Sequence, residues 1–455
     1  MSLDDARHQT PGQPGPTGTR SGETARRTVG DDALLGRHKT SNSGNKALLL
    51  AALERENMAR AWKRVKANKG SAGVDGLSIM ATAERLKTHW PQLKESLLNG
   101  TYRPLPVRRV LIPKPDGSMR ELGIPTVTDR LIQQAMLQVL QPVIDPTFSD
   151  HSYGFRPGRR AHDAVRRAQR YVQAGHTVVV DVDLEKFFDR VNHDVLMDRL
   201  SKRIADADVL RLIRRYLAAG VMMNGAVQER YEGTPQGGPL SPLLANVLLD
   251  DVDQELERRG HCFVRCADDC NVYVRSQRAG ERVMAGLRKL YGDLKLRLNE
   301  AKSAVSSALR RQFLGFSFYQ RGTEVRRRVA DKAMRAYKVR IRQLTQRSGG
   351  RSMAQVVDRL QVYVRGWRGY FQLSETPGVF AVLDGWLRHR LRALHLKQWK
   401  RGSTIYAALR RLGASHEDAE YVARNARSWW RNSALRLNRA LPIAYFDALG
   451  VPKLS

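Results

Sequence analysis

Two acidic spots in the sequence have residue types and spacing that could support metal-dependent phosphoryl transfer. Asp181 and Asp183 lie in the run VVVDVDLEKFFDRV, where strand alternation places both on one face. Asp268 and Asp269 lie in CFVRCADDCNVYV, whose two β-rich runs predict a hairpin with an acidic tip. Carboxylates on adjacent strands repel each other unless a cation lies between them, and Mg²⁺ prefers such oxygen ligands. Two ions about 3.5–4 Å apart can clamp the attacking and leaving oxygens of an in-line displacement.

An isolated Asp-Asp pair is usually a solvated turn, so the surroundings of these two spots matter. Both lie on strongly β-type runs, and the glycine-rich loop GTPQGG lies between them in the sequence. This loop opens the segment 233–256, which continues as an amphipathic helix, and its glycines allow the backbone to approach a ligand closely. The context therefore favours a site over a solvated turn.

The elements that must position these carboxylates follow from local periodicity. Helical spacing is present in four stretches: Lys46 to Val65, 128–141, 161–173 and 356–371. A hairpin is predicted over 104–125 around a Lys114-Pro115-Asp116-Gly117 turn, and 313–319 is a further β-like run. After Arg321 the composition predicts helices with heavy basic decoration. The sequence therefore predicts a mixed α/β region followed by a basic helical module.

Charge and composition narrow the class of protein. The 455 residues include 78 Lys+Arg and 45 Asp+Glu, a net charge of +33, which favours a polyanionic partner such as nucleic acid. No run approaches the roughly 18 apolar residues of a membrane span, and no apolar stretch follows the N-terminus as a secretion signal would. The three cysteines (Cys262, Cys266 and Cys270) exclude a disulfide framework, so a reducing, cytoplasmic location, associated with the nucleoid, is predicted.

The order of these motifs closely resembles that of the reverse transcriptases and maturases encoded by bacterial group II introns. VDLEKFFDRV, GTPQGGPLSPLLANVLL and CADD resemble the palm, whereas LIPKPDGSMRELGIPTVTDRLIQQA and SYGFRPGRRAHDA resemble the fingers. VRGWRGYF resembles the maturase (thumb, or X) domain, and LPIAYFDALGVPKL resembles the terminal DNA-binding segment. The resemblance implies a right-hand polymerase fold, α/β plus all-α. Its domains would be a disordered tail (1–45), fingers (46–175), palm (176–320), thumb/maturase (321–400) and a basic DNA-binding segment (401–455).

The resemblance also implies roles for individual residues. Asp183 and Asp268 would hold two Mg²⁺ ions and Asp269 would assist, although periodicity alone leaves Asp181 as an alternative to Asp183. The implied nucleotide-binding residues are Lys114 and Arg120 at the triphosphate, Phe188 as a steric gate, Gln236 beneath the nucleotide and Lys302 near the leaving pyrophosphate. Phe188 could instead be a core aromatic beside Phe187, and Lys302 a solvated lysine at a helix end.

Two features depart from the family pattern. The family has a tyrosine before Ala-Asp-Asp where this chain has Cys266, which leaves both carboxylates in place but affects packing near the primer end or nucleotide. The three cysteines lack a fourth ligand and a CxxC pair, so we interpret them as packing thiols. No cysteine follows Lys400 and the only later histidine is His416, so no endonuclease domain of the HNH type is expected.

The basic helices after Arg321 are predicted to bind RNA. The stretch 388–401 carries six Lys/Arg and no acidic residue, with tryptophans interleaved, which suits phosphates and unpaired bases. The predicted RNA-binding residues are Arg388, Arg390, Arg392 and Lys397. A charged solvent face is the alternative interpretation.

The predicted function is RNA-directed DNA synthesis by two-metal phosphoryl transfer, together with binding of group II intron RNA to promote splicing and target-primed reverse transcription. The predicted partners are intron RNA, an RNA template with a DNA primer, target DNA and deoxynucleoside triphosphates, with no membrane. The first alternative is a splicing-only maturase with a dead polymerase fold, against which Asp183, Asp268 and Gln236 argue. The second is a domesticated or defence-associated reverse transcriptase without an intron, against which VRGWRGYF argues.

Overall fold

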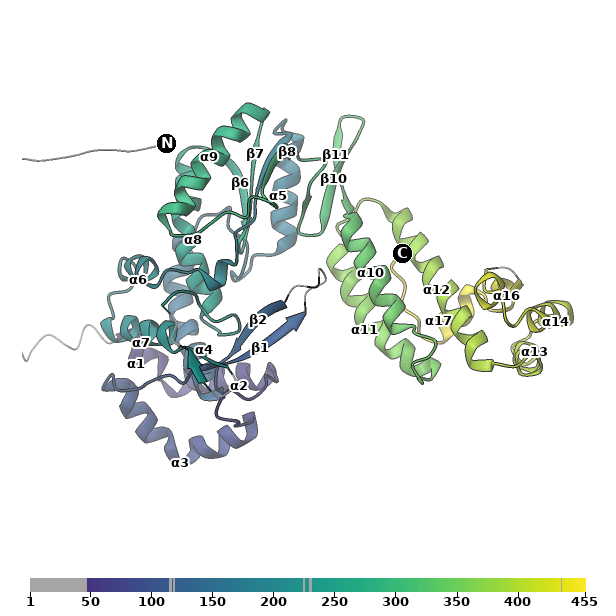
Figure 1. The fold of residues 1–455 in the computed structure, drawn as a ribbon, viewed down its shortest axis with the longest axis horizontal. Coiled ribbons are helices and arrows are strands. Elements are labelled where there is room, and N and C mark those ends of the chain that lie inside the picture. Colours follow the sequence, from purple (N-terminus) through teal and green to yellow (C-terminus); the bar gives the residue numbers. More distant parts are fainter. Residues whose placement is uncertain (1–46, 114–116, 118, 224–225, 229–230, 435) are drawn as a thin grey trace, which may run out of the picture. The chain divides into compact units, whose positions relative to one another are not determined.

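The computed structural model describes residues 47–455 except 114–116, 118, 224–225, 229–230 and 435 (Figure 1). The predicted tail, residues 1–45, lies outside the described residues, and so do Lys114 and most of the predicted hairpin turn. None of the helices in the described part combines the length and the apolar character needed to cross a bilayer.

The N-terminal region consists of helices around a four-stranded sheet of order β2-β1-β4-β5. Its helices are α1 (Ala47–Ala52), α2 (Arg55–Ala67), α3 (Ile79–Leu98), α4 (Val127–Ile144), α5 (Ala161–Gln173), α6 (His193–Ser201) and α7 (Ala207–Ala218), with short 3-10 turns at Asp145–Thr147 and Phe187–Asp189. Its strands are β1 (Val107–Pro113), β2 (Met119–Ile124), β4 (Val221–Met223) and β5 (Ala226–Gln228). The hairpin predicted over 104–125 and the helices at 128–141 and 161–173 are confirmed. The helix predicted from Lys46 to Val65 is instead two helices, because the chain turns at Leu53 and Glu54.

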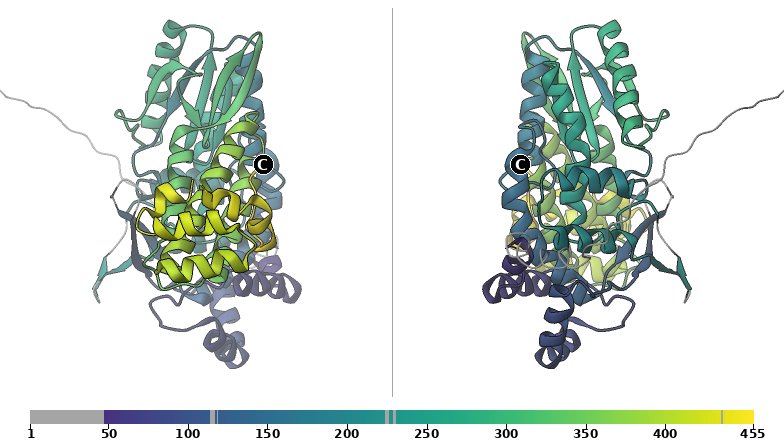
Figure 2. Two further views of the ribbon diagram at one scale, coloured as in Figure 1. Left: turned by 90° about the vertical axis from the view of Figure 1, so that its right-hand side faces the viewer. Right: turned by 90° about the vertical axis from the view of Figure 1, so that its left-hand side faces the viewer.

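The central sheet, of order β6-β7-β3-β8, carries the acidic residues. Its strands β3 (Val178–Val182), β6 (Cys262–Cys266), β7 (Asp269–Val274) and β8 (Ala304–Ser307) are all antiparallel to their neighbours. Helices α8 (Ser241–Arg258) and α9 (Gln277–Asp293) cover one face, and α5 covers the other (Figures 1 and 2). The valine run of β3 is explained by this arrangement, because Val180 and Val182 enter one apolar core and Val179 enters a second.

A small sheet joins the central region to the C-terminal helices. It has the order β11-β10-β9, formed by β9 (Gln312–Phe313), β10 (Phe316–Arg321) and β11 (Glu324–Val329). The prediction of helix from Arg321 onward is therefore wrong for EVRRRV, which pairs with β10 across a turn where Gly322 has φ +62°. The β-branched Val325 and Val329 favour a strand at both ends of this segment, and the turn allows a hairpin.

Helices form the remainder of the chain. They are α10 (Asp331–Leu344), α11 (Met353–Phe371), α12 (Pro377–Trp399), α13 (Gly402–Arg411), α14 (His416–Arg424), α15 (Trp429–Asn432), α16 (Arg436–Ala440) and α17 (Ile443–Ala448). The apolar stripe predicted over 356–371 is confirmed, since Val356, Leu360, Val364 and Phe371 are buried on α11. Ser352 caps this helix by accepting from the Gln355 amide at 3.3 Å.

Candidate active site

Asp183 lies directly after β3, where the backbone of a neighbouring segment holds it. The Asp183 amide donates to Ser303 Oγ at 3.1 Å, and the Asn299 amide donates to the Asp183 carbonyl at 2.8 Å. These bonds occupy the main chain and leave the carboxylate free to face outward, with its side chain 35% exposed. Lys302 Nζ lies 3.8 Å from Asp183 Oδ2. The Asp183 carboxylate therefore has one nearby cation, Lys302, at a long ion-pair distance.

Asp268 and Asp269 lie at the tip of the β6–β7 hairpin, as predicted. Cys266 pairs with Asp269, and Ala267 adopts φ +60° in the turn between them. Because the central sheet pairs Val182 on β3 with Cys270 on β7, the hairpin tip and Asp183 are brought to the same end of the sheet. The two acidic spots, 85 positions apart, therefore meet in space.

Burial and neighbouring carboxylates raise the pKa of Asp268 and of Asp269. Burial raises the pKa of Asp268, and the negative charge of Asp183 raises it further, while Arg120 opposes the shift. Burial raises the pKa of Asp269 to about 6, with added repulsion from Asp268, Asp183 and Asp181. A divalent cation would relieve this repulsion, and an all-oxygen donor set is the chemistry that Mg²⁺ prefers. In the described residues, however, no group of three or more His, Cys, Asp or Glu side chains is gathered as a metal centre.

Asp181 shares the strand with Asp183 but has a partner within the protein. Arg311 Nε and Nη2 lie 2.9 and 2.7 Å from Asp181 Oδ2, and Arg311 also donates to the Lys302 carbonyl at 2.6 Å. This ion pair neutralises Asp181 and ties β3 to the segment before β9. The structure therefore distinguishes two aspartates that strand periodicity left equivalent, and Asp183 is the one whose carboxylate stays available.

The glycine-rich loop brings Arg120 and Gln236 together. Arg120 Nε donates to Gln236 Oε1 at 2.8 Å, and the Gly123 amide donates to the Gln236 carbonyl at 3.0 Å. Gly237 has φ +131°, and a Cβ there would lie 2.7 Å from the Gly123 carbonyl oxygen, so only glycine fits this approach. Because Arg120 acts electrostatically on Asp268, three of the predicted site residues face one region.

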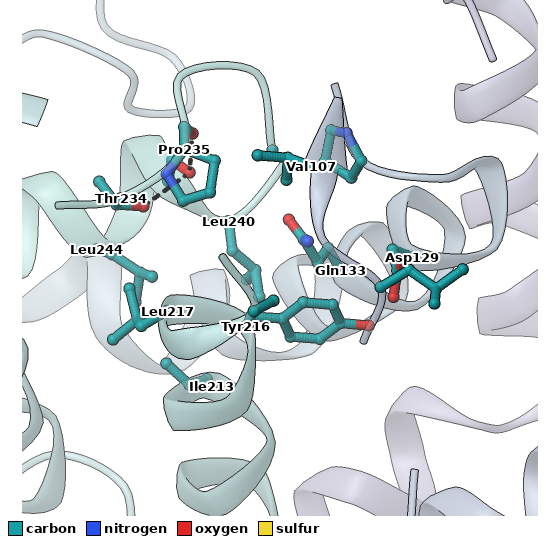
Figure 3. Close-up of a pocket in the computed structure, with 15 residues that line it drawn as sticks. Val107, Asp129, Gln133, Ile213, Tyr216, Leu217, Thr234, Pro235, Leu240 and Leu244 are labelled. Atoms are coloured by element: carbon teal, nitrogen blue, oxygen red, sulfur yellow. Dashed lines mark hydrogen bonds between the residues drawn. The ribbon is translucent and has the colours of Figure 1, made fainter. Parts of the chain in front are cut away.

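A small cavity lies behind this loop (Figure 3). Its volume of about 20 Å³ is bounded by Thr234 and Pro235 of the loop and by Asp129, Gln133 and Tyr216. Ser241 Oγ donates to the Pro235 carbonyl at 2.8 Å, while the buried carboxylate of Asp129 accepts from Tyr102 at 2.7 Å. Burial raises the pKa of Asp129. The cavity is too small for a substrate, and the hydrogen bond from Ser241 to Pro235 at its wall holds the loop in place.

Phe188 lies beside the glycine-rich loop, and Lys302 lies beside Asp183. Phe187 is buried at 3% exposure, whereas Phe188 is half-buried, and their ring centroids lie 5.1 Å apart. The Phe188 carbonyl accepts from the Thr234 amide at 2.7 Å, which places it beside the glycine-rich loop. The Lys302 side chain is 62% exposed near Asp183. Phe187 belongs to the core and Phe188 packs against it, so the gate role of Phe188 stays a prediction.

An open cleft begins at the carboxylates and runs along basic side chains. It has a volume of about 1150 Å³, and Asp183 and Asp269 lie at its acidic end. The basic residues of its wall come from the segments before β8 and before β9, from β11 and from α10: Lys302, Arg310, Arg311, Arg328, Lys332 and Arg335. An acidic end with basic walls suits a polyanionic strand whose reacting end is held by metal-bound carboxylates.

Comparison with known families decides what this arrangement is. Residues 112–318 match the family described as reverse transcriptase (RNA-dependent DNA polymerase), and residues 334–413 match the group II intron maturase-specific domain. The chain therefore contains a reverse transcriptase domain followed by a group II intron maturase-specific domain. The expected fold class, a reverse transcriptase fold followed by helices, is confirmed. Reverse transcriptases generally use divalent metal ions, in agreement with the carboxylates at the cleft.

The chain is also similar to individual proteins over part of its length. The chain is 39% identical to Protein YkfC of Escherichia coli over 218 residues, covering 47% of this chain and 57% of YkfC. It is 38% identical to the group II intron-encoded protein LtrA of Lactococcus lactis over 198 residues, covering 43% of this chain and 32% of LtrA. It thus spans only part of the length of the curated relatives it matches. A solved Cas6-RT-Cas1–Cas2 complex is similar at 26% identity over 54% of this chain and 42% of that one, with a TM-score of 0.36.

The four residues predicted to bind RNA do not form one surface. They lie on α12, where Arg388 and Arg392 share one side and Arg390 and Lys397 the other. Arg392 is buried at 5% exposure, and its Nε donates to the Leu441 carbonyl at 2.9 Å. Lys397 is exposed, and Arg388 and Arg390 are half-buried. Burial favours a packing role for Arg392, whereas the other three remain accessible.

One network around the hairpin was missed by sequence reasoning. Arg265 on β6 is completely buried, donates to both carboxylate oxygens of Asp253 on α8 at 2.8 Å, and donates to the Ala267 carbonyl and to Asn246 Oδ1 at 2.9 Å. Asn246 in turn donates to the Gly154 carbonyl at 2.9 Å. Arg265 thereby holds the turn that presents Asp268. The available signal was an arginine in the middle of an otherwise apolar strand.

The cysteines lie on the same hairpin as free thiols. Cys270 is buried, and burial raises its pKa to about 12, while burial raises the pKa of the half-buried Cys266 to about 11. Both thiols are therefore protonated at neutral pH, which suits the predicted packing role.

Proposed function

We propose that this chain is an RNA-directed DNA polymerase that also binds group II intron RNA, promoting its splicing and its insertion by target-primed reverse transcription. The observation that carries the proposal is the position of Asp183 and Asp269 at the end of a basic cleft, with Asp268 next to Asp269 at the hairpin tip. This arrangement occurs in a chain whose two matched domains are reverse transcriptase and intron maturase.

The proposed ligands of the divalent ions, two Mg²⁺, are Asp183 and Asp268, with Asp269 as the third carboxylate. When bound, such ions supply positive charge that stabilises the phosphoryl group as it is transferred to the primer. The support is the oxygen-only donor set and the mutual repulsion of its members. The identity of the metal as Mg²⁺ and the number of ions, two, are parts of the proposal.

The remaining residues would bind and orient the substrates. Arg120, held by Gln236, would bind the triphosphate with its guanidinium, together with Lys114. Phe188 would exclude a 2′-hydroxyl beside the sugar, and Lys302 would interact with the pyrophosphate as it leaves. The basic cleft wall would follow the backbone of the template and primer.

Other parts of the proposal concern partners and location. The substrates would be an RNA template with a DNA primer and deoxynucleoside triphosphates, and the maturase domain would bind intron RNA at its target DNA. The net charge of +33 supports association with the nucleoid in the cytoplasm. The absence of an endonuclease stays a prediction.

The test compares Asp183→Asn and Asp268→Asn with the matched control Asp358→Asn, an exposed aspartate on α11. Each site variant keeps its shape but loses a ligand charge, so primer extension on RNA should fall about a thousandfold or more, at about 1.4 kcal/mol for each factor of ten. The control should extend at the wild-type rate.

The same proteins are assayed for intron splicing at low magnesium. Splicing assistance should survive in Asp268→Asn, because it needs a docked RNA surface and the intron supplies its own chemistry. Retained cDNA synthesis in the site variants would refute the metal assignment. A wild-type protein that promotes splicing without extending primers would instead be a splicing-only maturase, and one that only extends primers would be a reverse transcriptase without an intron.

A further inference from the structure

A second pocket, lined by three tryptophans and three arginines, lies among the C-terminal helices. We call it the Trp–Arg pocket, and its residues are Arg342, Arg347, Trp386, Arg390, Ala393, Trp429 and Trp430. They come from α10, the segment after it, α12 and α15, and none of them lines the acidic cleft. Trp429 and Trp430 lie beyond residues 334–413, so the matched maturase domain alone does not complete the pocket.

The aromatic rings of the pocket are already organised by cations. The guanidinium carbon of Arg347 lies 3.1 Å from the ring centroid of Trp429, and those of Arg342 and Arg390 each lie 5.5 Å from that of Trp386. A guanidinium placed over a ring still has N–H groups at its edge for a phosphate oxygen. The pocket therefore offers flat stacking surfaces and phosphate donors in one place.

Trp430 is held in position while its ring stays accessible. The ring of His389 stacks on it with centroids 3.8 Å apart, and His389 Nε2 lies 2.9 Å from the Trp430 carbonyl oxygen. The residue remains 39% exposed. An indole fixed on one side and open on the other is suited to stacking with a further flat group.

The charge of the pocket lacks a counterion within the described residues. No acidic side chain lines it, and none of its three arginines forms an ion pair in the described part of the chain. Arg326 and Arg327 on β11, by contrast, pair with Glu324 and Glu375. Burial lowers the pKa of Arg390, and the positive charges of Arg342 and Arg347 lower it further. An anion in the pocket would relieve this repulsion.

The size of the pocket limits its occupant. Its volume of about 240 Å³ is smaller than the pockets of roughly 300–1,000 Å³ that enclose drug-sized ligands, and a duplex cannot enter it. Stacked or paired bases of a duplex present no free face, whereas an unpaired or bulged base in a folded RNA can insert between aromatic and arginine planes.

We propose that the Trp–Arg pocket binds one unpaired nucleotide of a single-stranded RNA segment, with its base against the tryptophan rings and its phosphate held by the arginines. The inference rests on the proposed binding of intron RNA and names a point of contact. It also gives Trp429 and Trp430, which lie outside the matched domains, a role in that contact.

The test uses the full chain and a fluorescently labelled ten-nucleotide single-stranded RNA, titrated by anisotropy at several salt concentrations. Trp430→Ala should weaken binding roughly tenfold, the effect of losing one base–aromatic stack, while Trp430→Phe should restore most of it. Replacing Arg342 and Arg390 with Gln should reduce the slope of log affinity against log salt by about 0.7 for each phosphate that the variant no longer neutralises. The matched control is Arg359→Gln, an exposed arginine on α11 outside the pocket.

Three further measurements test whether a base inserts, whether the ligand is RNA rather than DNA, and whether the pocket acts separately from polymerisation. A blunt RNA duplex should bind all variants equally, so an equal loss of duplex and single-strand affinity would overturn base insertion. The same sequence as DNA is a second arm, and a loss confined to DNA would overturn the assignment to RNA.

Primer extension, the third, distinguishes this inference from the proposed function. If wild type extends primers and binds RNA but the pocket variants bind as it does, the inference fails and the function stands. If wild type neither extends primers nor binds RNA, both fail. Variants that extend primers at the wild-type rate but lose single-strand affinity support the pocket.

Discussion

Arg265 shows how one residue can control a catalytic turn without touching substrate. It is the largest completely buried side chain among the described residues, and its donors are divided between the Asp253 carboxylate and the Ala267 carbonyl. Burying this charge is tolerated because both partners are in place. The turn that carries Asp268 has a residue at φ +60°, so an added hydrogen bond to its carbonyl matters for its position.

Asp253→Asn should lower the free energy of unfolding by about 3–5 kcal/mol, because it leaves a buried guanidinium without its counterion. The double variant Arg265→Met with Asp253→Leu should regain most of that stability, since a hydrophobic pair replaces the ion pair. Its primer-extension rate should stay low because the Ala267 carbonyl has lost its donor. Denaturant unfolding and primer extension on the same proteins measure both quantities.

The control is Arg199→Met, which removes a more exposed ion pair with Asp251 and should cost at most about 1 kcal/mol. A double variant with both stability and full polymerase activity would show that Arg265 serves the fold alone.

At the scale of elements, the site depends on how closely β2 and the glycine-rich loop approach. The Gly123 amide bonds the Gln236 carbonyl, and Gly237 next to it has φ +131°. Gln236 thereby reaches Arg120. The residues around the cavity of Figure 3 lie behind the loop. The glycine at position 237 is thus required by the close approach of β2 to the loop, and not by the turn preference of the loop itself.

Gly237→Ala should raise the KM for the incoming nucleotide, because a Cβ would displace the loop from β2 and move Gln236 away from Arg120. Steady-state primer extension with varied nucleotide concentration gives KM and kcat separately. Gly385→Ala on α12 is the matched control, since a Cβ there meets no atom within 4 Å. That control should leave KM unchanged and stabilise the helix by about 1 kcal/mol. An unchanged KM in Gly237→Ala would show that the loop does not position the nucleotide.

Across the whole molecule, some arginines are neutralised by carboxylates and others are not. Many surface arginines have carboxylate partners, such as Arg288 with Glu300, but Arg310, Arg328 and Arg335 in the cleft wall form no ion pair in the described part of the chain. Unpaired charge along one cleft raises the local potential for a nucleic-acid backbone. Within the net charge of +33, we therefore expect the unpaired arginines of the cleft wall to contribute most to nucleic-acid binding.

Replacing Arg310, Arg328 and Arg335 with Gln should weaken template–primer binding and reduce its salt dependence, because fewer counterions are released. The slope of log affinity against log salt should fall by roughly 2–3 units for a duplex substrate. A triple control on α9, Arg278, Arg282 and Lys289 to Gln, removes the same charge outside the cleft lining. Equal slopes for the two triple variants would show that net charge, rather than the cleft, sets the affinity.

Local patterns in the sequence predicted most of the elements and the acidic residues of the candidate site. Strand alternation predicted the acidic edge at Asp181 and Asp183 and the hairpin at Asp268, and motif order indicated the family. These signals are local, because periods of two and 3.6 depend only on neighbours along the chain. The helix expected after Arg321 was wrong at β11, where pairing with β10 prevailed over the basic composition.

Which of these residues are available depends on contacts between distant parts of the chain. Asp181 and Asp183 look alike in the strand, but Arg311, 130 positions away, neutralises the first. Arg392 resembles its neighbours on α12, yet the Leu441 carbonyl and burial hold it inside. Burial and ion pairing arise between segments far apart in the chain, and their electrostatic effects fall off over a few ångströms. A local pattern therefore gives a residue's type and face, while folding determines its partner.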